Sequence, residues 1–220
     1  MPSHSLDVLD RLSPVVPAAM AERAAAGRPG RLPAPAELAA SVVLLRDADG
    51  RLETYLMHRH SRMSFAASMV VFPGGRVDPG DGVTDPVTHC AVRETAEETG
   101  VVLGRGDLRA WAHWVTPELE PRRFDTHFFV AELPTGQTAE DISGETDRAE
   151  WSTPERALAE ASAGTIGLMP PTRSVLLELA DLGSTAAVLS AATGRIVERV
   201  LPAVVPTSDG WRFAYPRRMP

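Results

Sequence analysis

The stretch Phe72–Val101, FPGGRVDPGDGVTDPVTHCAVRETAEETGV, decides how the rest of the chain is interpreted. It opens with two glycines after an apolar run, passes through a loop rich in Asp, Gly and Pro, and ends in a series of good helix formers. On the predicted helix Glu94, Glu97 and Glu98 stand at positions i, i+3 and i+4. Three carboxylates therefore share one helix face, and they repel one another unless positive charge lies between them.

A divalent cation would supply that charge. Mg²⁺ prefers oxygen ligands, and a Gly-Gly pair lets backbone carbonyls approach a ligand closely. Pro86 lies near the start of the helix and Gly100 is placed to end it, so both ends are defined. The alternative is a solvated acidic face in which Arg93 pairs with Glu97 one turn away.

The segment Arg93–Val101, RETAEETGV, resembles the core of the Nudix box, R-E-U-x-E-E-x-G-U with U aliphatic. Every charged position and the glycine match, and Thr95 is the one mild departure. The resemblance implies a Mg²⁺- or Mn²⁺-dependent pyrophosphatase that hydrolyses a nucleoside diphosphate linked to another group. It also implies that Glu94, Glu97 and Glu98 bind the metal together with the backbone carbonyl of Gly74, and that Arg93 holds a glutamate in place.

The full box also expects a glycine and an acidic residue at fixed distances before the arginine. Counting eight residues back from Arg93 gives Asp85. Gly75 stands 18 residues before Arg93, so the loop is about four residues longer than in the family pattern. The expectation is that Asp85 orients Arg93 from this longer loop.

Candidates outside the box come from the loops and strands beside it. Glu145, in the acidic stretch DISGETDRAEW, is the preferred further ligand or general base, with Asp141 and Glu150 as alternatives. Guanidinium groups suit phosphate, which makes substrate-binding candidates of Arg59, Arg122 and Arg123. Four histidines have no recognised metal-ligand spacing and are interpreted as structural or surface residues: His58, His60, His113 and His127.

The remaining sequence predicts an α/β fold in which strands and helices mix without regular alternation. Ser41–Arg46 and Leu52–Arg59 form a hairpin around the turn DADG, and two later helices begin near Pro154 and at Thr172, which is the expected N-cap. The pattern predicts a mixed sheet with helices on both faces, and the resemblance makes this a Nudix-type α/β/α sandwich with extra C-terminal helices.

Domain organisation follows from composition. Residues 1–36, rich in Pro, Ala and Arg, are predicted to be an N-terminal extension with a short helix within residues 15–26. Residues 37–220 are predicted to form a single Nudix domain, with helical and strand additions from about residue 165. Over a longer stretch, roughly residues 38–185, the sequence resembles the branch of the family that contains the mammalian peroxisomal Nudix enzymes acting on coenzyme A.

Composition limits the partners and the compartment. A net charge of −7 argues against a nucleic-acid surface, and the absence of a long apolar run argues against a membrane span. No basic and apolar leader is visible, so a cytoplasmic location is expected. The single cysteine, Cys90, excludes an intramolecular disulfide. The resemblance favours a homodimer.

Several functions are compatible with these residues. Coenzyme A derivatives, NADH, ADP-ribose-like compounds and nucleoside triphosphates are all open as the small-molecule nucleotide substrate. A Nudix-fold binding or regulatory module without catalysis is the alternative from another class, and an acidic helix of purely structural role is a third. Metal-dependent turnover of a nucleotide would distinguish the hydrolase from the binding module and from the purely structural helix.

Overall fold

The computed structural model describes residues 3–27, 32–59, 69–144 and 146–216. Its strands are β1 (Ala36–Ala48), β2 (Arg51–Arg59), β3 (Met69–Val71), β4 (Gly74–Arg76), β5 (Arg109–Val115), β6 (Arg123–Glu132), β7 (Thr146–Ser152), β8 (Gly167–Leu168), β9 (Arg199–Val200), β10 (Ala203–Thr207) and β11 (Gly210–Ala214). Its α-helices are α1 (Ala18–Ala26), α2 (Pro86–Thr99), α3 (Pro154–Ser162), α4 (Pro170–Leu182) and α5 (Thr185–Ala192). Within the described ranges, nine strands form one sheet, with β8-β3-β2-β1-β6-β5-β9 in order, β4 also on β1 and β7 also on β2.

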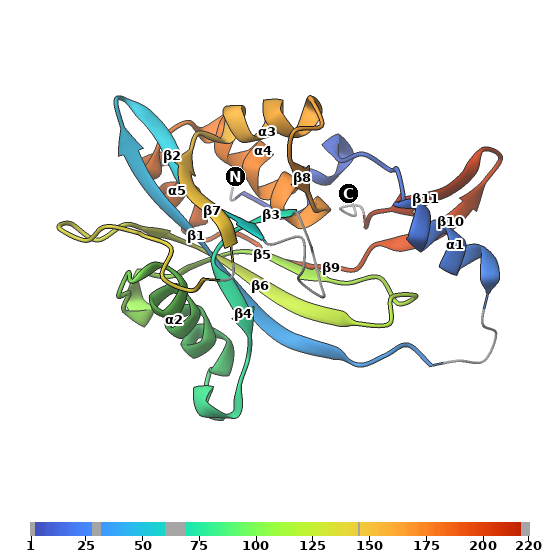
Figure 1. Cartoon of the computed structure of the whole chain (residues 1–220), viewed down its shortest axis with the longest axis horizontal. Helices are drawn as coiled ribbons and strands as arrows, with labels where there is room; N and C mark the ends of the chain where they lie inside the picture. The colour runs from blue at the N-terminus through green and yellow to red at the C-terminus, as the bar shows by residue number, and fades with distance from the viewer. Residues whose placement is uncertain (1–2, 28–31, 60–68, 145, 217–220) are drawn as a thin grey trace.

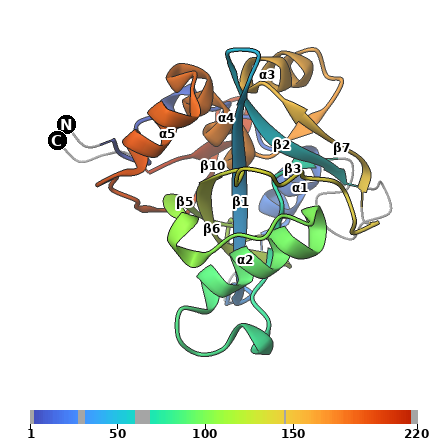
Figure 2. The same ribbon diagram turned by 90° about the vertical axis from the view of Figure 1, so that its left-hand side faces the viewer.

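The sheet is the middle layer of three. Helix α2 lies against one face, while α3, α4 and α5 lie on the other (Figures 1 and 2). Alternate residues of β1 divide between two cores, because side chains along a strand point to opposite faces. Val43 and Leu45 pack on the side of α4, and Val42 and Leu44 pack on the side of α2. The predicted sandwich with a mixed central sheet is confirmed.

Strand β1 is longer than predicted and has three partners. The DADG turn does join it to β2, with Asp49 and Gly50 at φ of 50° and 71°, the left-handed values that a tight hairpin requires. The first part of β1 runs parallel to β6. On its other edge Ala39–Ser41 pair with β4, which carries the two glycines. The low strand propensity of Ala36–Ala40 hid this extension, which pairing with β6 and β4 stabilises.

The ends of the helices were predicted with unequal success. Helix α2 starts at Pro86 and ends at Thr99, where Gly100 takes φ of 71°, as expected of a residue that ends a helix. The prediction that Thr172 caps α4 was wrong, because the helix begins at Pro170 after Met169. Proline has a helical φ and no N–H to satisfy, so it is well suited to the first turn.

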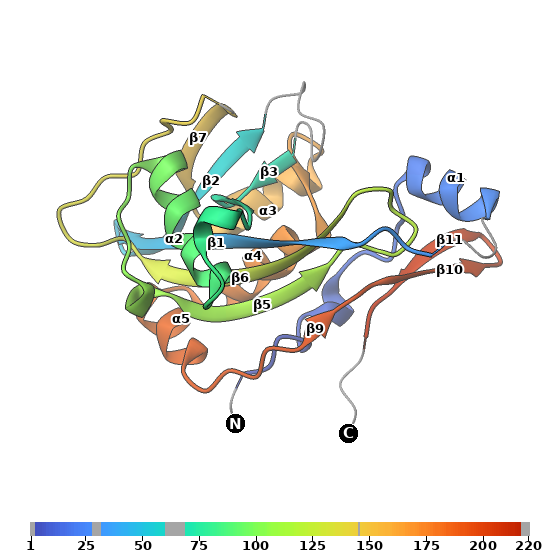
Figure 3. The same ribbon diagram turned by 90° about the horizontal axis from the view of Figure 1, so that it is seen from below.

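The N-terminal segment contributes to the core on the α4 side. Leu6, Leu9 and Leu12 are buried there together with Val175 and Leu179 of α4. Helix α1 lies beside the β10–β11 hairpin at one end of the molecule (Figure 3). Residues from both ends of the chain therefore border the same part of the sheet.

Within the described residues, no single helix is long and apolar enough to cross a membrane. In this described part of the chain, α4 and α5 taken together meet the requirement of length and composition, but they are bent by 113° at the break between them.

Candidate active site

The glycine pair on β4 positions one carboxylate of α2. The backbone N–H of Gly74 donates to Glu98 Oε2 over 2.7 Å. Gly74 has φ of 154°, and a Cβ there would lie 2.3 Å from the backbone oxygen of Ala40 on β1. Only glycine therefore allows β4 to lie this close to β1, and this close approach brings the Gly74 N–H to Glu98. Glu98 is 8% exposed, so its carboxylate is fixed by a directed hydrogen bond.

Gly75 makes room for a second carboxylate. A Cβ on Gly75 would lie 2.4 Å from the Glu94 carboxyl carbon, so the missing side chain is space that Glu94 occupies. Burial raises the pKa of Glu94, and the adjacent Arg93 opposes that rise. Glu97 lies further out, with 59% of its side chain exposed. The three carboxylates thus form a set whose solvent exposure increases from buried Glu98 to exposed Glu97.

Arg93 is the cation that holds this set together. Its Nη1 donates to Glu94 Oε1 over 2.7 Å and to Glu97 Oε2 over 3.0 Å. Its Nε and Nη2 each donate to one oxygen of Asp81 over 2.9 Å, and Nη2 also reaches the carbonyl of Arg76. These hydrogen bonds, led by those to Asp81, raise the pKa of Arg93 and lower the pKa of Asp81.

The expectation that Asp85 orients Arg93 was wrong, because Asp81 does so. Asp81 is 3% exposed and also accepts the N–H of Asp78 over 2.8 Å. Asp85 has φ of 53° just before α2 and makes no side-chain cap. Asp81 follows Gly75 by six residues, which is the family spacing, so the extra residues lie after the acidic residue. Counting forward from Gly75 would have found it.

Cys90 packs behind this network. It is wholly buried, its Sγ lies 3.5 Å from the carbonyl oxygen of Gly75, and burial raises the pKa of its thiol to about 12. A protonated, inaccessible thiol is a packing group, since the thiolate is the reactive form.

The carboxylates open into a cavity of about 900 Å³. Its floor is the sheet, and its walls come from α1, the loop after β5 and the first turn of α4. Polar lining comes from Glu94, Glu97, Glu98, Arg23, Arg59, Arg76, Glu120, Arg122, Ser41, Ser143, Thr116, Thr126 and Thr172. Its apolar lining includes Met20, Met69, Phe72, Trp114, Phe124, Phe128, Met169, Pro170, Pro171 and Phe213. The cavity lining therefore combines the three carboxylates and several arginines with a large number of apolar side chains.

The three predicted phosphate-binding arginines have different surroundings. Arg59 lines the cavity, and its Nε is buried without a hydrogen-bond partner among the residues that the structure describes. Arg122 also lines the cavity, with its guanidinium carbon 5.2 Å from the centre of the Phe124 ring. Arg123 is 7% exposed and donates to the carbonyls of Thr116 and Ala34, so its guanidinium joins chain segments together.

Glu145 lies outside the described residues, but the loop before it is placed. The N–H groups of Glu140 and Ile142 donate to the carbonyls of Thr99 and Glu98 at the end of α2, each over 3.1 Å. Ile142 and Ser143 line the cavity. The acidic loop is thus anchored beside Glu98. The two alternatives have other partners, since Asp141 bonds Ser143 and Thr146, and Glu150 bonds His58.

Comparison with known proteins identifies the family. A model of the NUDIX domain matches residues 35–170, which is more than half of the chain. The protein therefore belongs to the Nudix family.

Individual relatives are more distant. The Caenorhabditis elegans protein named nudix hydrolase 7 is 26% identical in an alignment 180 residues long that covers 66% of this chain and 60% of that protein. The human acyl-coenzyme A diphosphatase NUDT19 is 32% identical over 108 residues, 47% of this chain and 29% of that protein. The chain thus spans less than two thirds of the length of each.

Solved structures agree on the fold. A NUDIX hydrolase from Alicyclobacillus acidocaldarius superposes with a TM-score of 0.64 at 24% identity, covering 71% of this chain and 96% of its own. The NUDIX domain of Shewanella oneidensis NrtR, solved with ADP ribose, gives a TM-score of 0.51 at 18% identity over 76% of this chain and 97% of its own.

Proposed function

We propose that this protein is a hydrolase of diphosphate bonds in nucleotide derivatives, and that it uses Mg²⁺ or Mn²⁺, bound by Glu94, Glu97 and Glu98, to cleave the diphosphate of a coenzyme A derivative. The observation that carries the proposal is that all three carboxylates line one cavity, with Glu94 and Glu97 held by Arg93 and Glu98 held by the N–H of Gly74.

The donor set fits a hard cation. All three side chains offer carboxylate oxygens, which Mg²⁺ and Mn²⁺ prefer, and the Gly74 carbonyl is the proposed backbone ligand. Burial already raises the pKa of Glu94, so bound cation would compensate a cost that the free protein bears. When bound, the metal would neutralise charge on the diphosphate and acidify a coordinated water.

The chain's own residues supply orientation. Arg93 keeps Glu94 and Glu97 from turning away, and Asp81 keeps Arg93 in place. Arg59, whose Nε has no hydrogen-bond partner among the described residues, would offer that N–H to a phosphate oxygen, and Arg122 lines the same cavity. Glu145 remains our proposed general base, on the loop anchored beside Glu98.

The cavity lining favours a substrate with an apolar arm. Methionines, prolines and aromatic residues contribute much of the lining, and the acyl group on a long pantetheine arm would supply an apolar chain for such a surface. NUDT19, which is similar over part of this chain, is named for action on acyl-coenzyme A. Free nucleoside triphosphates would leave this lining exposed to water.

The test is product analysis by mass spectrometry on acyl-coenzyme A, coenzyme A, NADH, ADP-ribose and ATP, with Mg²⁺, Mn²⁺ or EDTA. We expect fastest cleavage of acyl-coenzyme A, none in EDTA, and ¹⁸O from water in one product. Glu98→Gln keeps an oxygen that can accept the Gly74 N–H, yet should lower the rate by at least about 100-fold. Glu155→Gln, at an exposed position on α3, is the matched control.

Each outcome is decisive. Full activity of Glu98→Gln would refute the metal assignment, and preference for a substrate without an apolar arm would refute the coenzyme A assignment. Metal-dependent binding without turnover of any compound would make the chain a binding module.

A further inference from the structure

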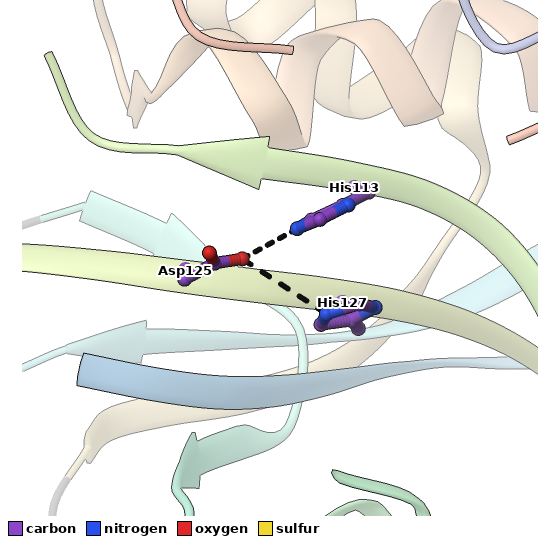
Figure 4. A group of neighbouring side chains, drawn as sticks. All are labelled: His113, Asp125 and His127. Atoms are coloured by element: carbon purple, nitrogen blue, oxygen red, sulfur yellow. Dashed lines mark hydrogen bonds and ion pairs between the residues drawn. The ribbon is translucent and has the colours of Figure 1, made fainter. Parts of the chain in front are cut away.

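Two histidines and an aspartate meet on the α2 side of the sheet, away from the Nudix carboxylates. His113 on β5 and His127 on β6 are directly opposite in the antiparallel pairing, and Asp125 precedes His127 by two residues. All three therefore point to the same face. Figure 4 shows a dashed line from the Asp125 carboxylate to each of the two imidazole rings. The rings are stacked with centroids 4.0 Å apart.

The polar atoms of the three side chains converge. His113 Nε2 is in hydrogen-bond contact with Asp125 Oδ1, and His127 Nε2 lies 3.9 Å from the same oxygen. One ligand atom from each residue falls within 4.8 Å of the others. The side chain of His113 is 18% exposed, that of His127 35% and that of Asp125 21%, so the group is partly shielded but reachable from solvent.

An ion pair alone does not account for this group. A single His–Asp pair would satisfy Asp125, but His127 also faces that oxygen and makes no hydrogen bond among the described residues. Arg199 Nε, at 3.9 Å from Asp125 Oδ2, is the nearby cation and approaches the other carboxylate oxygen. Two imidazoles and a carboxylate whose ligand atoms lie this close together are a metal-binding set.

We propose that His113, Asp125 and His127 bind a divalent transition metal of the Zn²⁺ class at a site separate from the Nudix carboxylates. Zn²⁺ takes nitrogen ligands at about 2.0–2.1 Å and carboxylate oxygen at about 2.0–2.2 Å, which small side-chain rotations of these residues permit. Imidazole selects Zn²⁺, Co²⁺, Ni²⁺ or Cu²⁺ over Mg²⁺. The two sites thus differ in the metals they accept.

The location gives the second site a consequence for the substrate cavity. His127 is paired with Ala40 of β1, which is paired with Gly75 of β4, so the two sites are two strand spacings apart, roughly 10 Å. The neighbours of the ligands on the opposite face, Trp114, Thr126 and Phe128, line the cavity. A metal joining β5 to β6 would therefore fix the floor of the cavity from behind.

The test uses tag-free Glu97→Gln/Glu98→Gln protein, so that the Nudix carboxylates are weakened, in a buffer containing millimolar Mg²⁺. Co²⁺ is titrated and its visible absorption bands are followed, and Zn²⁺ then competes for the site. We expect one equivalent of Co²⁺ with the intense bands of a four-coordinate site. Adding His127→Gln should abolish the bands and weaken Zn²⁺ binding at least 10-fold.

His127→Gln is the informative change because the His127 side chain makes no hydrogen bond among the described residues. A thermal melt without metal verifies that the variant is folded. His58→Gln is the matched control, since His58 is another half-buried strand histidine whose Nε2 lies 3.1 Å from a single carboxylate, that of Glu150. Unchanged Co²⁺ bands in His127→Gln, equal losses in the control, or no Co²⁺ binding by the parent protein would overturn the proposal.

Discussion

Replacing Asp81 by Asn tests how the active-site helix is held in place. Asp81 is 2% exposed at its side chain and accepts three hydrogen bonds, two from Arg93 and one from the N–H of Asp78. Breaking a buried ion pair costs about 3–5 kcal/mol, but Arg93 is 27% exposed, so water recovers part of that. We expect the free energy of unfolding to fall by about 2 kcal/mol.

Activity should fall as well, for a positional reason. Without Asp81, the Arg93 guanidinium loses its anchor, so Glu94 and Glu97, which already accept hydrogen bonds from it, are free to move with it away from metal. Outer partners of metal ligands typically contribute about 10–100-fold to affinity or rate, so a loss in that range is expected, mainly as a higher metal requirement. Urea unfolding in EDTA measures the first effect, and turnover against Mg²⁺ concentration measures the second.

Asp85→Asn is the internal control. Asp85 has left-handed φ, which Asn tolerates, and no side-chain cap to lose, so its stability should stay within about 0.5 kcal/mol and its activity near wild type. If Asp85→Asn were the more damaging of the two changes, or Asp81→Asn had the metal requirement of the wild type, the role given to Asp81 would be untenable.

Two further predictions concern packing and pH. Gly75→Ala should lower the free energy of unfolding by about 1 kcal/mol or less, because Glu94 can swing aside, and should also lower the metal affinity. Gly74→Ala should lower the free energy of unfolding by about 3 kcal/mol, because its Cβ meets the backbone of β1. Urea unfolding and metal titration distinguish the two variants. Burial raises the pKa of Glu178 from its ordinary 4.5 to about 6, so the carboxyl group holds its proton more tightly in the folded protein than in the unfolded chain. The free energy of unfolding should therefore fall by about 2 kcal/mol as pH rises from 4.5 past 6. Glu178→Gln removes that slope, and parallel curves for both proteins in urea unfolding at pH 4–7 would contradict it.

Local signals predicted the elements whose ends are chemically marked. Pro86 and Gly100 define α2, and the Asp-Gly turn defines the β1–β2 hairpin, because the backbone geometry needed there restricts the residue type. The start of β1 and the burial of Leu6 and Leu9 depend on neighbours distant in sequence, so no local pattern marks them.

The candidate site divides in the same way. The helix face with Glu94, Glu97 and Glu98 is periodic and was visible, whereas Asp81 required the insertion to be placed on the correct side of the acidic residue. The His113–Asp125–His127 group depends on the register between β5 and β6, which shifts between Ala110 and Ala112. That shift cannot be counted from spacing along the chain, and the histidines therefore gave no signal.

Because Asp81 holds Arg93, the loop between Asp81 and α2 supplies no side chain to the hydrogen bonds described for Arg93. Val83 is 99% exposed there, and Cys90 is buried with a thiol that stays protonated at neutral pH. A cysteine introduced at Val83 would be the one thiol open to a maleimide dye, because labelling requires an accessible thiolate. This loop is therefore an attachment point for a fluorophore two residues after Asp81 that leaves Arg93 and the three carboxylates unaltered.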